Sequence, residues 1–130
     1  MQVSDTDTFE SRIPLDQLSV LLDFGHEFRF DPISSVEMES YFVDLLKRFQ
    51  GNSSELRAWI GSKIEQSFRW LTSPPRWIQN PDWQVCSNGP MLFIGQIDSP
   101  PVEGIFHDEA CFYIFFDAAT AECRTIMQIA

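Results

Sequence analysis

His107, Asp108 and Glu109 are consecutive, and this trio is the combination in the sequence most typical of a catalytic or metal-binding site. An imidazole beside carboxylates can act as a general base or bind a metal ion. Neighbouring residues at the edge of a strand point to opposite faces, so a site would need ligands from elsewhere, for example Asp98 or His26. We expect a solvated loop here, with an acidic docking element and a metal or catalytic site as alternatives.

The three cysteines, Cys86, Cys111 and Cys123, form no CxxC pair and, with only two histidines, are too scattered to indicate a zinc site. Cys111 alternates with Tyr113 and Phe115, which predicts a buried thiol on the core side of a strand. The sequence contains no GxSxG, P-loop, GxGxxG or HExxH motif. We therefore predict that the protein holds no metal and no cofactor and is not an enzyme.

Two tryptophans, Trp77 and Trp83, lie in the segment RWIQNPDWQVCSNGPMLFIGQID, residues 76–98. A tryptophan has a large apolar body and one N–H group, so it can cover the edge of a core while bonding at its rim. An exposed pair would instead form a binding hot spot. Gln96 and Asp98 can satisfy backbone groups at the strand end. The segment is thus either a lid over a helix–sheet junction or a recognition surface.

The chain is strongly acidic. Its 130 residues include 19 Asp and Glu against nine Lys and Arg, a formal net charge of −10, and only Arg76 and Arg124 are basic beyond residue 70. This charge should repel nucleic-acid phosphates and anionic membranes and attract a basic partner, although it also favours solubility alone. A content of 44% apolar residues, with twelve phenylalanines, predicts a folded chain with a real core.

The first residues, MQVSDTDTFES, carry early acids and no apolar core, which is unlike a signal peptide. No apolar run approaches the length of a transmembrane helix. We therefore expect a cytoplasmic protein that binds neither membrane nor nucleic acid.

Leucine spacing predicts a first helix over residues 14–24, which Gly25 would end, followed by an extended connection through HEFRFDP. A second helix should begin with a capping box between Ser34 and Glu37 and should close at Gly51. A third should begin near Ser53 or Ser54 and run on until Pro74 and Pro75. The short link between the second and third helices predicts an antiparallel helical hairpin.

Beyond Pro75 the pattern changes to strands. The stretches PMLFIGQID, CFYIFFD and ECRTIMQIA predict three strands, the last two joined by a short hairpin loop. Helices followed by strands indicate an α+β fold, with a helical hairpin packed on a C-terminal antiparallel sheet. We expect one domain over residues 1–130, with a flexible tail at 1–12, a helical part at 13–72 and a β-rich part at 75–130.

Residues 75–128 carry a resemblance to a known family. A Trp-Ile-Gln turn, a Gly-Pro-Met stretch, a strand ending in Gln-Ile-Asp, an aspartate-containing loop and an aromatic Tyr-x-Phe strand follow one another in the order typical of the YwqG-like (DUF1963) family. The resemblance implies a β-rich module and carries over no settled activity. Some relatives have paired cysteines near the Met-containing strand; only Cys86 stands there in this chain, so the resemblance implies no metal. The matching positions are Trp77, Ile78, Gln79, Pro81, Gly89, Met91, Phe93, Gln96, Asp98, Asp108, Tyr113, Phe115 and Gln128.

The leading functional hypothesis is a non-enzymatic protein that binds a basic protein partner, for example a bacterial toxin that it neutralises as immunity proteins do. The acidic composition, the small size and the lack of a catalytic motif support it. The partner-binding residues would be the acidic side chains and the two tryptophans of the β-rich part: Trp77, Trp83, Asp82, Asp98, Asp108 and Glu109.

Two alternatives stay open. A small-molecule binder or enzyme would have a pocket between the sheet and the helices, lined by Gln96, Asp98, His107 and Tyr113. A homodimer or scaffold subunit would pair through the last strand, ECRTIMQIA, if that strand is an edge of the sheet.

Overall fold

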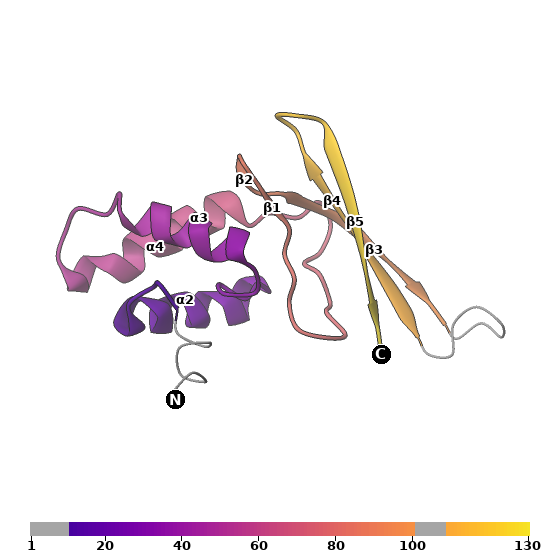
Figure 1. Ribbon diagram of the computed structural model, residues 1–130, viewed down its shortest axis with the longest axis horizontal. Coiled ribbons are helices and arrows are strands. Elements are labelled where there is room, and N and C mark those ends of the chain that lie inside the picture. The colour runs from indigo at the N-terminus through magenta and orange to yellow at the C-terminus, as the bar shows by residue number, and fades with distance from the viewer. Residues whose placement is uncertain (1–10, 101–108) are drawn as a thin grey trace, which may run out of the picture.

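The computed structural model describes residues 11–100 and 109–130 and consists of a helical half and a β half that lie side by side (Figure 1). The three strands of the main sheet are antiparallel in the order β3-β4-β5, and β1 and β2 form a separate short hairpin. The prediction of an α+β fold is therefore confirmed. The elements are α2 (Leu15–Phe28), α3 (Val36–Leu46), α4 (Ser53–Ser67), β1 (Val85–Cys86), β2 (Gly89–Pro90), β3 (Leu92–Ser99), β4 (Ala110–Asp117) and β5 (Glu122–Ile129).

Helix α2 continues past Gly25, so the predicted stop and the predicted extended stretch after it are wrong. The helix ends at Phe28, and Arg29 adopts the left-handed conformation, with φ of 70° and its N–H bonded to the Gly25 carbonyl at 2.8 Å. Burial of Phe30 anchors this cap. Gly25 is needed for a different reason, because a Cβ atom there would lie 2.5 Å from the carbonyl oxygen of Phe30.

Helix α3 is shorter than predicted and has a different cap. Ser35 is the N-cap, and its hydroxyl accepts a hydrogen bond from the Met38 N–H at 3.0 Å, so the capping box predicted at Ser34 and Glu37 is wrong. After Leu46 the chain tightens into i to i+3 bonds as far as Phe49, well before Gly51. The buried side chains of the helix are Met38, Phe42 and Leu45.

Helix α4 starts at Ser53, as predicted, but ends at Ser67, seven residues before Pro74. The chain leaves the helix because residues 69–71 pair with the first part of β3: the Phe93 N–H bonds the Arg69 carbonyl at 3.0 Å, and the Leu71 N–H bonds the Phe93 carbonyl at 3.1 Å. Helices α3 and α4 are joined at one end by residues 47–52, as expected for a helical hairpin, and α2 lies along them (Figure 1).

Residues 11 and 12 do not belong to a flexible tail. The Ser11 hydroxyl donates to Glu39 of α3 at 2.8 Å, and Arg12 forms an ion pair with the same carboxylate at 3.1 Å. Residues 1–10, the rest of the predicted tail, lie outside the described residues. Among the helices that are described, none combines the length and the apolar composition that a membrane crossing requires.

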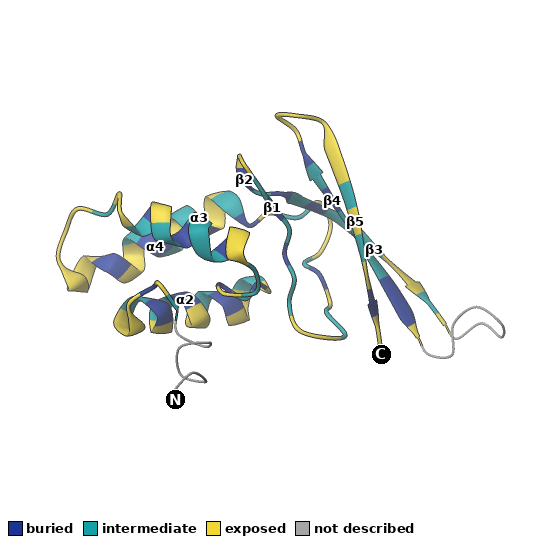
Figure 2. Cartoon of the chain, in the orientation of Figure 1, coloured by how far each residue is buried: buried dark blue, intermediate teal, exposed yellow. Residues whose placement is uncertain are grey.

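One buried aromatic column joins the helices to the sheet. Phe68 at the end of α4 stacks on Phe30 at 4.1 Å between ring centroids and meets Trp83 edge-on at 5.3 Å. Trp83 in turn meets Phe115 of β4 at 5.7 Å, and Phe115 packs on Phe93 of β3 at 5.3 Å. Figure 2 shows the consequence, since burial is concentrated along β4 and on the facing sides of the helices, whereas much of β5 is exposed.

Candidate functional site

The two tryptophans have different roles. Trp83 is 1% exposed, and its Nε1–H donates to the Met91 carbonyl at 2.9 Å, so the hypothesis of a surface anchor is wrong for this residue. Trp77 is half-buried, stacks on Tyr113 with 4.5 Å between ring centroids, and donates from Nε1 to the Arg29 carbonyl at 2.7 Å. Both tryptophans thus hold the segment between the helices and the sheet in place through packing and an indole hydrogen bond. Of the two, only Trp77 has a ring that is partly accessible to solvent.

Gln96, Asp98 and Tyr113, which the sequence suggested for a pocket or a partner contact, lie together on one face of the sheet. Gln96 bonds both the N–H and the carbonyl of Arg76, at 2.8 and 3.0 Å. Asp98 accepts hydrogen bonds from the Cys111 thiol at 2.9 Å and from the Arg76 guanidinium at 3.0 Å. Tyr113 donates its hydroxyl proton to the Arg76 carbonyl at 3.0 Å. These hydrogen bonds hold Arg76 against the sheet. None of the three side chains lines the hollows described below.

The electrostatics of this group oppose nucleophilic or acid–base chemistry. Burial, followed by the hydrogen bond to Asp98, raises the pKa of the Cys111 thiol, so the thiol stays protonated and weakly reactive. Burial also raises the pKa of Tyr113 well above the ordinary tyrosine range. Asp98 has its pKa lowered by hydrogen bonds from Cys111 and Gln96 and by Arg76, so it stays ionised. These directions fit a structural network.

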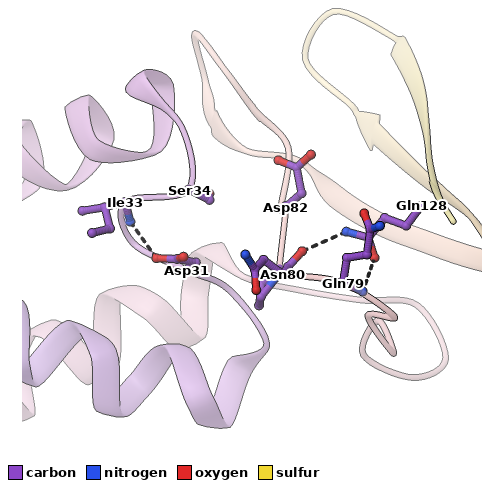
Figure 3. Close-up of a pocket in the computed structure, with 8 residues that line it drawn as sticks. Asp31, Ile33, Ser34, Gln79, Asn80, Asp82 and Gln128 are labelled. Carbon is purple, nitrogen blue, oxygen red and sulfur yellow. Dashed lines mark hydrogen bonds between the residues drawn. The ribbon is translucent and has the colours of Figure 1, made fainter. Parts of the chain in front are cut away.

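A hollow of about 680 Å³, which we call the junction pocket, lies where the helical and β halves meet. Figure 3 shows its wall built from two facing segments, the connection between α2 and α3 on one side and the residues before β1 on the other, with Gln128 of β5 beside the latter. The lining is polar apart from an isoleucine and a proline: Asp31, Ile33, Ser34, Gln79, Asn80, Pro81, Asp82 and Gln128.

Gln128 fixes one wall of the junction pocket. It is 6% exposed, and its side-chain oxygen accepts from the N–H groups of Ile78 and Gln79 at 3.2 and 3.0 Å. Its side-chain nitrogen donates to the Asn80 carbonyl at 2.8 Å. One buried amide therefore satisfies three backbone groups of a loop that has no regular secondary structure, and this holds residues 78–80 in place.

The charge of the junction pocket is one-sided. Asp31 and Asp82 contribute carboxylates, and no lysine, arginine or histidine belongs to the lining. Asp31 accepts the Ile33 N–H at 3.0 Å, and burial raises the pKa of Asp82, for which no basic side chain compensates within the described residues. The Ser34 hydroxyl in the same wall is buried and has no hydrogen-bond partner among those residues. The pocket is therefore rich in hydrogen-bond acceptors.

A second hollow, of about 710 Å³, adjoins the junction pocket and shares Asp31 and Pro81 with it. Trp77 and Arg29 contribute to its lining, together with residues from the end of α2. The two hollows therefore lie next to each other along the helix–sheet boundary. Their linings include Trp77 and Asp82, two of the residues that the sequence suggested for partner binding.

Of the other residues that the sequence suggested for a site or a partner contact, His26 lines the second hollow, and the rest of those that the structure describes line neither hollow. Asp98 lies in the sheet network, and Glu109 is exposed at the start of β4, where its carbonyl accepts the Ala130 N–H at 2.9 Å. His107 and Asp108 lie outside the described residues, so the predicted trio is not placed. Sequence reasoning missed Asp31 and Ser34 and gave Gln128 no role in a site. The only available signal was an acidic residue next to a proline, as in the stretches FDP and NPD, and such pairs are common in turns.

The pKa shift of Asp82 gives a first testable prediction. The folded chain binds the carboxyl proton of Asp82 more tightly than the unfolded chain does. As pH rises from about 3.9, the ordinary pKa of aspartate, to above the raised pKa of the folded chain, ionisation of Asp82 therefore lowers the free energy of unfolding. Asp82→Asn should therefore stabilise the protein at neutral pH by about 0.5 kcal/mol, since the partly solvated carboxylate is screened. The gain in stability should vanish in acid, where Asp82 of the parent chain is protonated and is as neutral as the asparagine that replaces it.

Urea denaturation of Asp82→Asn and the parent chain across the acid-to-neutral range measures this difference. Glu65→Gln, at an exposed position of α4, is the matched control and should show no such pH-dependent gain. A gain in the free energy of unfolding that is equal at every pH would show that the gain does not come from the ionisation of Asp82.

Comparison with known proteins supplies no relative. No protein-family model matches the chain, and no curated protein and no solved structure is significantly similar to it. The resemblance of residues 75–128 to the YwqG-like family therefore stays a prediction, and function is argued from the site alone.

Proposed function

We propose that this is a non-enzymatic binding protein that takes a lysine or arginine side chain of a basic protein partner into the junction pocket. The observation that carries the proposal is the lining of that pocket, with two carboxylates and no basic residue. Lysine and arginine only donate hydrogen bonds, so an acceptor-rich wall suits them. The net charge of −10 would steer such a partner toward the surface.

The composition of the wall favours a protein side chain over a free small molecule. Small-molecule pockets are mostly apolar with a few polar groups, and the junction pocket has the opposite balance. The adjoining hollow offers the half-buried ring of Trp77, and a tryptophan beside a polar anchor site is a common binding hot spot. A basic bacterial toxin that the protein neutralises is the concrete partner that we propose.

Peptide titration followed by nuclear magnetic resonance tests the proposal. The probes are a short arginine- and lysine-containing peptide and a counterpart in which citrulline and acetyl-lysine replace these residues. We expect amide shifts at Ser34, Gln79, Asn80 and Asp82 with the charged peptide only. Asp82→Asn should weaken binding about tenfold, because charge-assisted hydrogen bonds contribute about 1.5–3 kcal/mol.

The control is again Glu65→Gln, which removes the same charge far from the pocket residues in sequence and should leave affinity unchanged. Binding should weaken as salt is raised. Shifts spread evenly over the acidic surface, or equal affinity in Asp82→Asn and the parent chain, would show that only non-specific charge attraction operates and would overturn the proposal.

A further inference from the structure

The main sheet has two edges, β3 and β5, and the β3 edge is protected. The first part of β3 is already paired, because the Phe93 N–H and carbonyl bond the segment 69–71 at 3.0 and 3.1 Å. A register irregularity interrupts the ladder between Phe93 and Gly95, and the Asp98 carboxylate further along the strand forms an ion pair with Arg76 at 3.0 Å. Coverage, a bulge and charge are the usual devices that prevent an edge from pairing with another chain.

The β5 edge has none of these devices. Its pairing with β4 runs without a register shift from Glu122 to Ile129, and the strand contains no proline or glycine. Its two charged residues, Glu122 and Arg124, form an ion pair with each other at 2.7 Å. The rest of the strand, from Thr125 onward, has no charged side chain. A long, regular and uncharged edge of this kind is a template for another strand.

The register shows which backbone groups of β5 point outward. The Ala130 N–H bonds the Glu109 carbonyl at 2.9 Å, so these two residues are a hydrogen-bonded pair at the end of the β4–β5 ladder. Bonded and non-bonded pairs alternate along an antiparallel ladder. Cys123, Thr125 and Met127 are therefore in non-bonded pairs, and their N–H and carbonyl groups point away from β4. All three residues are exposed, and none of these backbone groups has a hydrogen-bond partner among the described residues.

The free part of the β5 edge is limited at both ends. At one end the chain turns, with Ala121 in the left-handed conformation at a φ of 62°. At the other end the Gln79 side chain donates to the Ile129 carbonyl at 2.6 Å and so occupies the next outward acceptor. Residues 123–127 remain, which we call the edge window, and the middle residue of this window is Thr125.

The edge window is complementary to itself. An antiparallel copy related by a two-fold axis at Thr125 would bond Thr125 to its own counterpart, and Cys123 to Met127 in both directions. Every outward group of the window then gains a partner, which no other two-fold register achieves. Threonine pairs and apolar pairs across two strands are stabilising. Arg124 would lie opposite Ile126 of the second copy and would keep the counter-ion of its own strand.

Charge also favours a second copy over a basic partner at this edge. The chain has a net charge of −10, so two copies repel each other over most of their surface. The window and the adjoining Glu122 are neutral together, because Glu122 is paired with Arg124. Two copies can therefore meet here without local repulsion, and a basic strand would find no unpaired acidic side chain.

We propose that β5 pairs along the edge window with β5 of a second copy of the chain, so that one antiparallel sheet continues across both copies. The contact is narrow, which places the dimer among the weak complexes that bury less than about 1,200 Å². Because the β3 edge is protected, the assembly closes at two copies. Backbone groups make the contact, so it does not depend on what lies over either face of the sheet. It uses no residue that lines the junction pocket.

Sedimentation equilibrium of the full chain from about 10 µM to about 1 mM tests this pairing, since weak complexes dissociate in that range. We expect a monomer–dimer equilibrium without larger species. Thr125→Pro should weaken the dimer about thirtyfold, because proline lacks the N–H that donates at the two-fold axis. The lost N–H has no bond within the monomer, and edge strands accept proline at such positions, so the fold should survive.

Thr125→Val is the matched control. It changes the same side chain but keeps the backbone N–H and a β-branched residue, so it should leave the dimer unchanged. Circular dichroism of both variants verifies that the sheet is intact. Raised salt should strengthen the dimer by screening the net charge, the reverse of the effect expected for peptide binding in the junction pocket.

Amide hydrogen exchange of the parent chain gives a second readout that needs no variant. The N–H groups of Cys123, Thr125 and Met127 gain acceptors only in the dimer, whereas those of Arg124 and Ile126 are bonded to β4 in the monomer. Protection of the first three should therefore rise with protein concentration, about tenfold between 10 µM and 1 mM for a complex of this strength. Protection of the other two should stay nearly constant.

Three results would overturn the proposal. A chain that stays monomeric over the whole range would leave the window to a strand of a different protein. A dimer that Thr125→Val weakens as much as Thr125→Pro would depend on the side chain and not on backbone pairing. A dimer in which exchange at Cys123, Thr125 and Met127 is independent of concentration would have its contact elsewhere.

Discussion

Trp83→Ala should lower the free energy of unfolding by about 3–5 kcal/mol, the usual loss when a large buried aromatic is removed. Trp83 is 1% exposed and lies between Phe68 of the helical half and Phe115 of the sheet. Its removal leaves a cavity in the middle of the aromatic column and frees the Met91 carbonyl from its indole donor. Since domains are stable by about 5–15 kcal/mol, the loss is a large part of the total.

The midpoint of urea denaturation measures this effect, and Trp59→Ala is the matched control. Trp59 is half-buried, packs against Phe49 in a tilted arrangement with 5.2 Å between ring centroids, and lies under the Lys63 ammonium on the surface of α4. Its loss should cost only about 1–2 kcal/mol. Equal costs at the two positions would mean that Trp83 does not join the two halves as described.

Gln128→Leu should cost about 2–4 kcal/mol of stability. Leucine is close to glutamine in size, so the change acts through hydrogen bonds and leaves the volume nearly unchanged. It leaves the N–H group of Gln79 and the carbonyl of Asn80 without their partner, whereas the Ile78 N–H keeps the Tyr113 hydroxyl as an acceptor at 3.1 Å. Each buried unpaired group costs about 1–3 kcal/mol. Water can recover part of this, since Gln79 and Asn80 are exposed.

The same variant should weaken binding of the charged peptide about tenfold, because the wall formed by residues 79–82 is no longer held. Denaturation and peptide titration on one preparation give both quantities. Gln66→Leu is the control, since Gln66 is exposed on α4 and makes only a long bond of 3.5 Å to Ser62. A loss of stability with unchanged peptide affinity would separate Gln128 from the binding function.

The strands were the most predictable part of the fold. Each strand of the main sheet has turn residues on both sides, and an apolar run such as CFYIFFD is too short to form a stable helix instead. As a result, β3, β4 and β5 lie where the sequence predicted them. The helix ends were less predictable because distant contacts decide them. Burial of Phe30 extends α2 beyond Gly25, and the pairing of residues 69–71 with Phe93 ends α4 before its prolines.

The candidate site was predicted only in part. Asp82 and Trp77 were named from composition, and they do line the junction pocket and the second hollow, respectively. Asp31 and Gln128 were not expected there, because the pocket is made by segments that are about 50 residues apart, and no local periodicity reports such a meeting. Gln96 and Tyr113 were assigned to a pocket, but backbone groups of residue 76 occupy their polar atoms.

The aromatic column has a consequence for the order in which the chain is made. The helices leave the ribosome first, with Phe30, Phe42 and Phe68 presenting a common surface that has no cover until the sheet follows. Phe115 comes 47 residues after Phe68 in the sequence, which at about 5–20 residues per second is roughly 2–9 s of synthesis. During that interval the nascent chain is a natural client for a chaperone, and Trp83 is the residue whose arrival begins to close the exposed surface.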